Sequence, residues 1–490
     1  MKYCRLMAAP LIFSFIACAA HAVPIDWRGA FGVDTTLINT FRKIDSNNDN
    51  SAVGAGTQEV PTPYGGHAKA SFQSYLFRLN PIMVVNDSAT IKGEITTGYG
   101  RGGFFGDSST ESKQGNMGNA LYFYNTSNGS SNLVLSKLYA ELYSDTATYV
   151  VGRQTTHFGL GLVYNSGENL WDRQSYTRDG MTMKVKIGNF HVAPYYAVLN
   201  NGTTLTRATK ATEYGASLTY DNPERDLTIG LLYAKREHDW ANTTIKSTTA
   251  TATGVAAPWG KTDIKVTDIY LKKVLGRFTL GAEFPMFSGE MGDLNRDGSK
   301  TKYNAKALVG QGSYKFNDTW KAGIEAGTVS GDAGGTGSFK AMYLNPNFQF
   351  ANILFRYNLF AISSPSTYNV WDSYVTNTRF IKGQLSYVND KWDWNWAVIY
   401  AVANEVARGG NGTAFNHTTN RRFTSTTAQS DKLGTEFDCN LTFHWNNDVE
   451  VGGNFGYLAT GDYWAYTNSA TTKNTTKDTW LIQAKTGISF

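Results

Sequence analysis

The chain has 490 residues, with 45 lysines and arginines against 40 acidic residues, and its formal net charge is +5. That charge falls to +3 if the first 22 residues are removed, because Lys2 and Arg5 leave and no acid does. A net charge so close to zero does not indicate nucleic-acid binding.

The amino terminus predicts a secretory signal peptide. Lys2 and Arg5 precede an apolar stretch that ends in small residues, and this pattern indicates cleavage after Ala22. A lipid anchor on Cys18 is the alternative, but Phe15 stands where such signals usually have leucine. The mature chain would retain only Cys439, so we expect neither an internal disulfide nor a cysteine-based metal cluster.

Composition favours strands that cross a membrane. After residue 22 no uninterrupted apolar run reaches about 18 residues, which argues against a transmembrane helix. The chain has 49 glycines, 11 prolines, 28 tyrosines, 27 phenylalanines and 12 tryptophans. A secreted chain rich in aromatic residues and glycine is typical of an outer-membrane β-barrel, in which every second strand residue faces water.

In chain order, alternating segments occur around short polar turns. Residues 214–220 and 227–233 flank the turn 221–226, and residues 437–443 and 449–457 flank the turn 446–448. Each pair predicts a β-hairpin. The alternation places Cys439 on the lipid side. The last segment, 480–490, has the apolar face Trp480, Ile482, Ala484, Thr486, Ile488 and Phe490. Its 11 residues, at about 3.3 Å each and tilted by roughly 40°, match the about 25 Å apolar band of such barrels.

Short turns alternate with long polar loops, which predicts periplasmic turns and extracellular loops. We predict an all-β fold, a transmembrane antiparallel up-and-down β-barrel of about 18 strands, with 16 to 20 left open. Residues 338–361 could be one strand plus a folded-in loop, and residues 262–274 alternate poorly. The first strand begins at Ile25 or Asp26, so we predict one domain, 23–490, without an amino-terminal plug.

A soluble β-sandwich or propeller would also alternate. The segment that carries Trp392, Trp394 and Trp396 argues against a soluble fold. Three tryptophans on one strand face after a short turn are typical of the aromatic belt at a membrane–water interface.

The sequence does not predict an enzyme. His444 lies beside a short turn, at the wrong end of the barrel for an external substrate, and His238 and Asp239 point to opposite faces of a strand. We expect no cofactor and no metal site. Asp293, Asn295 and Asp297, followed by Gly298, are calcium candidates, but Asn304 stands where the pattern expects glutamate.

The strand pattern predicts charged residues that line the lumen. These are Lys92, Glu94, Lys184, Lys186, Glu213, Lys321, Glu325, Glu436, Asp438, Glu450 and Lys485. Five cations stand against six anions, so neither sign dominates. That balance favours broad diffusion over a one-signed selective path.

One stretch is a candidate constriction loop. Residues 153–179 carry opposite charges that could face one another across a lumen, namely Arg153, Glu168, Asp172, Arg173, Arg178 and Asp179. An exposed loop with local ion pairs is an equal alternative.

The chain resembles the porin superfamily of Gram-negative outer membranes. The resemblance is carried by the signal peptide, the hairpin GSYKFNDTWKAGIEAG, the stretch VGRQTTHFGLGL and the terminal Phe490 after an alternating strand. It implies a porin-like major outer-membrane protein, surrounded by outer-membrane lipid and lipopolysaccharide, that admits small hydrophilic solutes and forms trimers. A closed structural or adhesive barrel, or an outer-membrane hydrolase, is the alternative function.

Overall fold

The computed structural model describes residues 24–45, 69–97, 100–105, 133–200, 211–238, 261–292, 300–359, 369–469 and 471–490. The predicted signal peptide, the calcium candidates Asp293, Asn295 and Asp297, and Asp239 lie outside these residues. Within them, no helix is long and apolar enough to cross a membrane.

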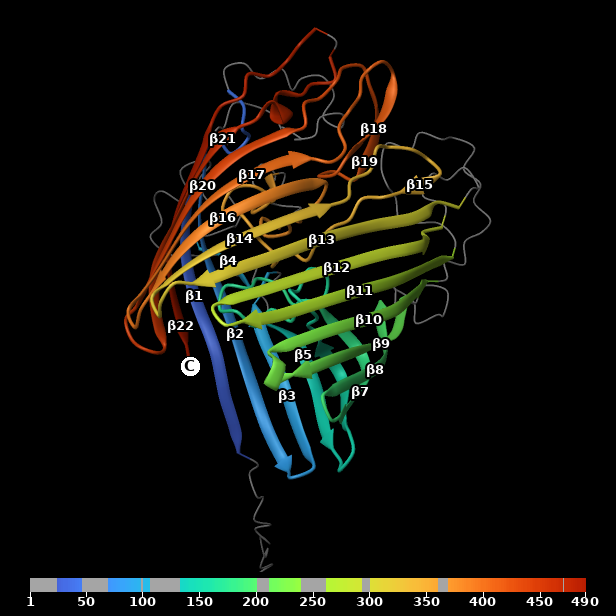
Figure 1. Ribbon diagram of the computed structural model, residues 1–490, viewed down its shortest axis with the longest axis vertical. Helices are drawn as coiled ribbons and strands as arrows, with labels where there is room; N and C mark the ends of the chain where they lie inside the picture. Colours follow the sequence, from blue (N-terminus) through green and yellow to red (C-terminus); the bar gives the residue numbers. More distant parts are fainter. Residues whose placement is uncertain are drawn as a thin grey trace, which may run out of the picture.

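Eighteen antiparallel strands form a closed barrel, as the alternation predicted (Figure 1). We call these wall strands the staves. The staves are β1 (Ile25–Asn39), β2 (Lys69–Asn86), β3 (Ala89–Thr97), β5 (Leu133–Tyr143), β6 (Thr148–Thr155), β7 (Thr177–Ile187), β8 (Phe190–Asn200), β9 (Ala211–Asn222), β10 (Leu227–His238), β11 (Thr262–Leu275), β12 (Phe278–Glu290), β13 (Lys302–Lys315), β14 (Trp320–Val329), β16 (Thr378–Val388), β17 (Trp392–Ala403), β20 (Lys432–His444), β21 (Val449–Thr460) and β22 (Thr479–Ser489).

The ring closes where the last strand meets the first. Each stave pairs with the next along the chain, and β22 pairs with β1 from Trp480↔Asn39 to Ser489↔Ala30. Figure 1 shows the blue β1 beside the red β22. Closure leaves no unpaired sheet edge in the wall, which a strand structure needs in lipid.

One rim of the barrel carries only short turns. Connections of two to four residues join β2–β3, β5–β6, β7–β8, β9–β10, β11–β12, β13–β14, β16–β17 and β20–β21. Gly188 and Gly276 have φ values of 59°, which a two-residue hairpin turn requires of its glycine. The connections at the other rim are longer, as predicted.

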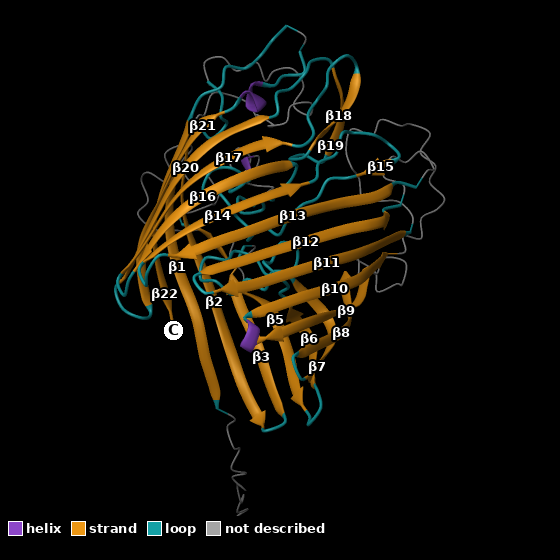
Figure 2. Ribbon diagram, viewed as in Figure 1, coloured by secondary structure: helices purple, strands orange, loops and turns teal. Residues whose placement is uncertain are grey.

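Smaller strands lie on the long-loop side (Figure 2). β4 (Gly102–Phe104) pairs with β2, and β15 (Ser338–Phe339) runs parallel to β13. β18 (Gly412–Asn416) and β19 (Arg421–Ser425) form a separate hairpin. Of the short helices in the described residues, η5 (Asp462–Ala465) lies on this side and η4 (Pro223–Arg225) lies in the short turn between β9 and β10.

The two uncertain regions have clear outcomes. Residues 262–274 form the stave β11, although they alternate poorly. Residues 338–359, the described part of the other region, form no stave: β15 has two residues, and the chain then folds into the barrel.

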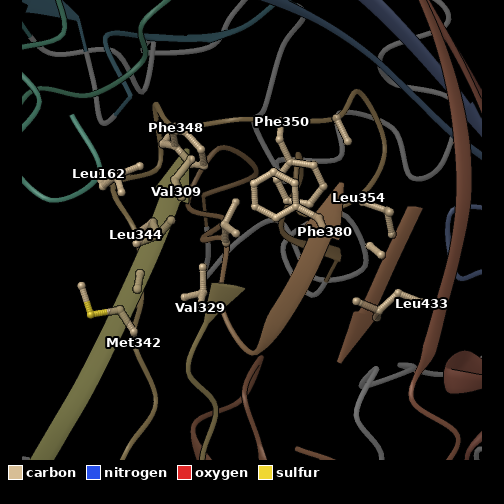
Figure 3. Packing of buried hydrophobic residues seen from close by; sticks show 14 of the residues in the cluster. Leu162, Val309, Val329, Met342, Leu344, Phe348, Phe350, Leu354, Phe380 and Leu433 are labelled. Carbon is tan, nitrogen blue, oxygen red and sulfur yellow. The ribbon is translucent and has the colours of Figure 1, made fainter. Parts of the chain in front are cut away.

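The apolar core lies inside the barrel. Leu162, Leu344, Phe350 and other residues of inward-folded segments pack against the inner wall, as Figure 3 shows with Val309, Val329, Phe380 and Leu433. The rings of Phe350 and Phe380 stack in parallel with centroids 4.0 Å apart. This packing holds the segments against β13, β14, β16 and β20.

Candidate functional site

The first inward segment crosses the lumen. We name residues 156–176, between β6 and β7, inner loop A. The backbone N–H groups of Leu160 and Leu162 donate to the carboxylate of Glu283 on β12. Farther along the loop, the Arg173 guanidinium donates to Asp34 on β1 at 2.5 Å. Because β1 and β12 lie nearly opposite in the ring, inner loop A must span the barrel.

Buried basic side chains hold the middle of inner loop A. Arg78 and Arg101 donate to the carbonyl of Gly167 at 2.9 and 2.5 Å. Arg101 also pairs with Glu94 at 3.0 Å, and Lys137 pairs with the same carboxylate at 3.0 Å. These groups are at most 9% exposed, so they bind the loop and face little free water.

A second segment meets the first. We name residues 340–359 inner loop B. The N–H groups of Ile353 and Leu354 donate to Glu436 at 2.6 and 2.9 Å, and that of Asn352 donates to Asp438 at 3.1 Å. The two loops are joined because the Asn345 N–H donates to the carbonyl of Leu162 at 2.7 Å. Together they narrow the middle of the barrel.

Glu213 lies at the centre of a buried cluster. Its carboxylate accepts hydrogen bonds from the guanidinium of Arg236 and from the Tyr195 hydroxyl at 2.8 Å. Tyr164 and Tyr176 of inner loop A donate to it at 3.3 and 3.4 Å. Burial raises the pKa of Tyr176 to about 12, so this hydroxyl keeps its proton and remains a donor at neutral pH.

All eleven predicted lumen residues lie on the inner side of the wall, but they differ in exposure. Lys184, Lys186 and Lys321 are exposed. Lys92, Glu325, Glu450 and Lys485 are partly buried. Glu94, Glu213, Glu436 and Asp438 are buried at 0 to 6% exposure, because they bind inner loops or buried cations.

The constriction prediction is wrong for Arg153 and Asp179. These two residues pair at 2.7 Å on β6 and β7, each about half exposed, beside the outward-facing Val151 and Met181. The ion pair therefore lies on the outer face. Strand alternation continues through both residues, because β6 ends only at Thr155 and β7 already begins at Thr177, so the observed loop is shorter than the predicted 153–179.

The other four candidates lie inside the barrel. Arg173 binds Asp34, and Lys137 on the wall approaches Glu168 at 3.3 Å. Asp172 caps the N–H of Asn169 at 3.0 Å. Arg178 belongs to β7, where its guanidinium stacks over the Tyr195 ring at 3.5 Å.

Several inward charges escaped the sequence reasoning. Arg236 could have been found, since it continues the inner face of Leu232 and Ala234. Lys137 was hidden by a register shift between Glu94 and Ile95, which breaks the alternation across β3 and β5. Asp34 and Asp268 lie on staves whose faces mix polar and apolar residues, so periodicity gave a weak signal.

A pocket opens on the long-loop side of the inner loops. Its volume is about 460 Å³, and residues from inner loop B, the β18–β19 hairpin and the end of β1 line it. Tyr357, Asn377 and Lys43 are among them. Burial lowers the pKa of Lys43 to about 8, and its ammonium lies 4.5 Å from the centre of the Trp464 ring.

The candidate histidine His444 faces the lumen at the short-turn rim. Its Nε2 lies 3.0 Å from the Asp393 carboxylate. This rim is where the sequence placed His444.

The outer wall is apolar. Exposed leucines, isoleucines and valines alternate with buried inner residues on every side of the ring, among them Leu231, Ile269, Leu308 and Ile381. At the short-turn rim, rings of Trp392, Trp394 and Trp396 lie in a chain with centroids 6.3 and 5.4 Å apart. An apolar band edged by aromatic rings is what lipid requires of a closed strand wall.

The chain is a transmembrane β-barrel of the outer-membrane type. Cys439 lies on the lipid side of this barrel, as expected, in register with Trp396 and Phe455.

No protein-family model and no curated protein matches the sequence. Among solved structures, several bacterial outer-membrane proteins are similar. Pseudomonas aeruginosa OccK5 (OpdH) has 10% identity and a TM-score of 0.46, over 95% of this chain and 98% of that one. Pseudomonas aeruginosa OpdK with vanillate has 10% identity and a TM-score of 0.45, over 95% and 99%. Outer-membrane expressed OmpT of Vibrio cholerae has 10% identity and a TM-score of 0.35, over 95% and 97%.

Proposed function

We propose that this outer-membrane barrel is a porin, a passive diffusion channel for small hydrophilic solutes and ions with weak ion selectivity. The supporting observation is the exposure of Lys184, Lys186 and Lys321 on the inner wall toward the short turns. A lumen filled with side chains would bury these lysines, at a high cost in free energy for unpaired cations. Water therefore reaches the mouth of the lumen at the short-turn rim.

The two inner loops set the size limit in this proposal. Inner loops A and B narrow the middle, and the pocket of about 460 Å³ lies on their long-loop side. Glu325, Glu450 and Lys485 line the approach from the turns beside the exposed lysines. The proposed channel performs no chemistry, so it needs no cofactor, metal or catalytic residue.

The rival function is a closed structural or adhesive barrel. It is favoured by the hydrogen bonds that tie inner loop A to β12, to β1 and to inner loop B. Both functions predict insertion into lipid and a β-sheet spectrum. They differ in whether a continuous path passes the inner loops.

Conductance of the mature protein, residues 23–490, in a planar bilayer decides between them. Stepwise, ohmic conductance with a small reversal potential in a salt gradient is expected of the weakly selective channel. A protein that inserts, keeps its β-sheet spectrum and carries no current contradicts the porin and favours the closed barrel.

Processing and surroundings complete the proposal. We expect export with cleavage after Ala22, a single barrel domain over 23–490, and lipopolysaccharide among the surrounding outer-membrane lipids. Trimers follow from the resemblance to porins. The molecular mass in detergent, corrected for bound detergent, would be about three times that of one chain, and a monomer mass would contradict trimers.

A further inference from the structure

A row of cations stands on the outside of the barrel. Lys265 on β11, Lys306 on β13 and Arg379 on β16 are exposed, and each lies beside a buried inner residue, Val266, Ala307 and Phe380 respectively. Since neighbouring strand residues face opposite sides, the three cations point outward. They therefore play no part in the lumen.

The three cations lie at one level. Each stands nine or ten residues from the short-turn end of its strand, at Leu275, Lys315 and Val388. Nine residues of about 3.3 Å, tilted by roughly 40°, rise about 23 Å, close to the height of an outer-membrane apolar band. The row thus marks the edge of that band toward the long loops.

Apolar residues lie below the row, toward the short turns. Leu308, 47% exposed, is the next outward residue after Lys306, and Ile381, 48% exposed, is the next after Arg379. On β11, Thr267 follows Lys265 on the outer face, and Ile269, 42% exposed, comes after it. A cation directly above lipid-facing side chains lies where lipid headgroups begin.

No acid of the described residues neutralises the row. Lys265, Lys306 and Arg379 form no ion pair there. The nearby acids contact other lysines, because Asp263 and Glu237 share Lys235, at 3.1 and 2.5 Å, and Glu290 binds Lys300 at 2.7 Å. Three cations without an ion pair attract anions from the membrane surface.

The spacing suits a headgroup with more than one phosphate. β11, β12, β13, β14 and β16 are consecutive staves. Four steps of about 4.8 Å across the strands, with a register offset of four residues of about 3.3 Å along them, put Lys265 and Arg379 about 23 Å apart, with Lys306 between them. Asn304, Ser288 and Thr328, which face outward between the cations, add neutral hydrogen-bonding groups.

We propose that Lys265, Lys306 and Arg379 form a binding site for the phosphates of an anionic outer-leaflet glycolipid. Lysine and arginine both bind phosphate, and arginine does so with two parallel hydrogen bonds. The site is independent of solute passage, so it can stand or fall apart from the porin function.

The test compares lipid binding by charge variants. Native mass spectrometry of the detergent-solubilised protein would be run with bis-phosphorylated lipid A and with its dephosphorylated form. We expect the phosphorylated lipid to be retained preferentially. Lys265→Ser, Lys306→Ser and Arg379→Ser should each weaken its binding by about fivefold, and the triple variant by well over tenfold.

Two control variants separate the site from general charge and from folding. Arg277→Ser, Lys315→Ser and Lys391→Ser remove the same charges from the short-turn rim and should leave binding within about twofold of the parent. Lys265→Arg, Lys306→Arg and Arg379→Lys should retain it. Equal losses in the two serine triples, or no preference for phosphorylated lipid, would overturn the proposal. So would unchanged lipid binding with a changed subunit mass, which would assign the row to a protein contact.

Discussion

At the scale of single residues, several buried carboxylates bind cations or backbone N–H groups of the inner loops. Their inward position in the strands did not predict this role. Glu213 is fully buried and faces Arg236, with Arg178 3.9 Å away. Glu436 and Asp438 accept backbone N–H groups of inner loop B. An inward charge on a stave can therefore hold a loop without contributing to the ion selectivity of the lumen.

Glu213→Gln should strongly destabilise the barrel, because it removes the carboxylate partner of Arg236, whose side chain is only 25% exposed. We expect a loss of about 3–5 kcal/mol in the free energy of unfolding, measured by urea denaturation in lipid vesicles. Asp318→Asn, which removes an exposed partner of Lys315, should cost about 0–1 kcal/mol. Equal losses in the two variants would show that Glu213 is not an anchor.

The buried Lys43 predicts a pH dependence. Its pKa of about 8 lies below the usual 10.5, so between these values the unfolded chain binds more protons. Stability should therefore rise between about pH 8 and pH 10.5, by about 1–3 kcal/mol. Denaturation of the parent and of Lys43→Met at pH 7.5 and 10 measures this. The variant should lack this part of the rise, and identical pH profiles would contradict the assignment.

At the scale of elements, inner loop A depends on two distant anchors, Glu283 on β12 and Asp34 on β1. Arg173→Ala removes the second and should free the far half of the loop. Single-channel records should then show larger conductance or frequent flicker between levels. Arg408→Ala, at an exposed long-loop pair, should behave as the parent. A quiet, unchanged Arg173→Ala channel would show that this anchor does not hold the constriction.

At the scale of the whole molecule, the exposed lumen charges near the turns decide ion preference. Replacing Lys184, Lys186 and Lys321 by serine removes three cations from a weakly selective path. The reversal potential in a salt gradient should then shift toward cation preference. Lys265→Ser, which changes the charge outside the wall, should leave it unchanged. Equal shifts from both variants would indicate a surface effect and contradict the lumen assignment.

The sequence by itself determined the staves and their faces. A period of two is a local property, so Ile482 and Leu481 could be placed outside and inside the wall from their neighbours alone. The short turns and the ring of about 18 strands followed from the same spacing. Alternation failed where pairing shifted, as it did opposite Lys137.

Only the tertiary structure decided the path of the loops. Nothing periodic in residues 156–176 or 340–359 shows that they meet inside the barrel, because contacts such as Leu162–Glu283 and Gln174–Asn347 join residues 121 and 173 positions apart. The tertiary structure also decided which inward charges face water. Lys184 and Glu436 both point inward, but a loop covers only Glu436, and that cover depends on packing across the lumen.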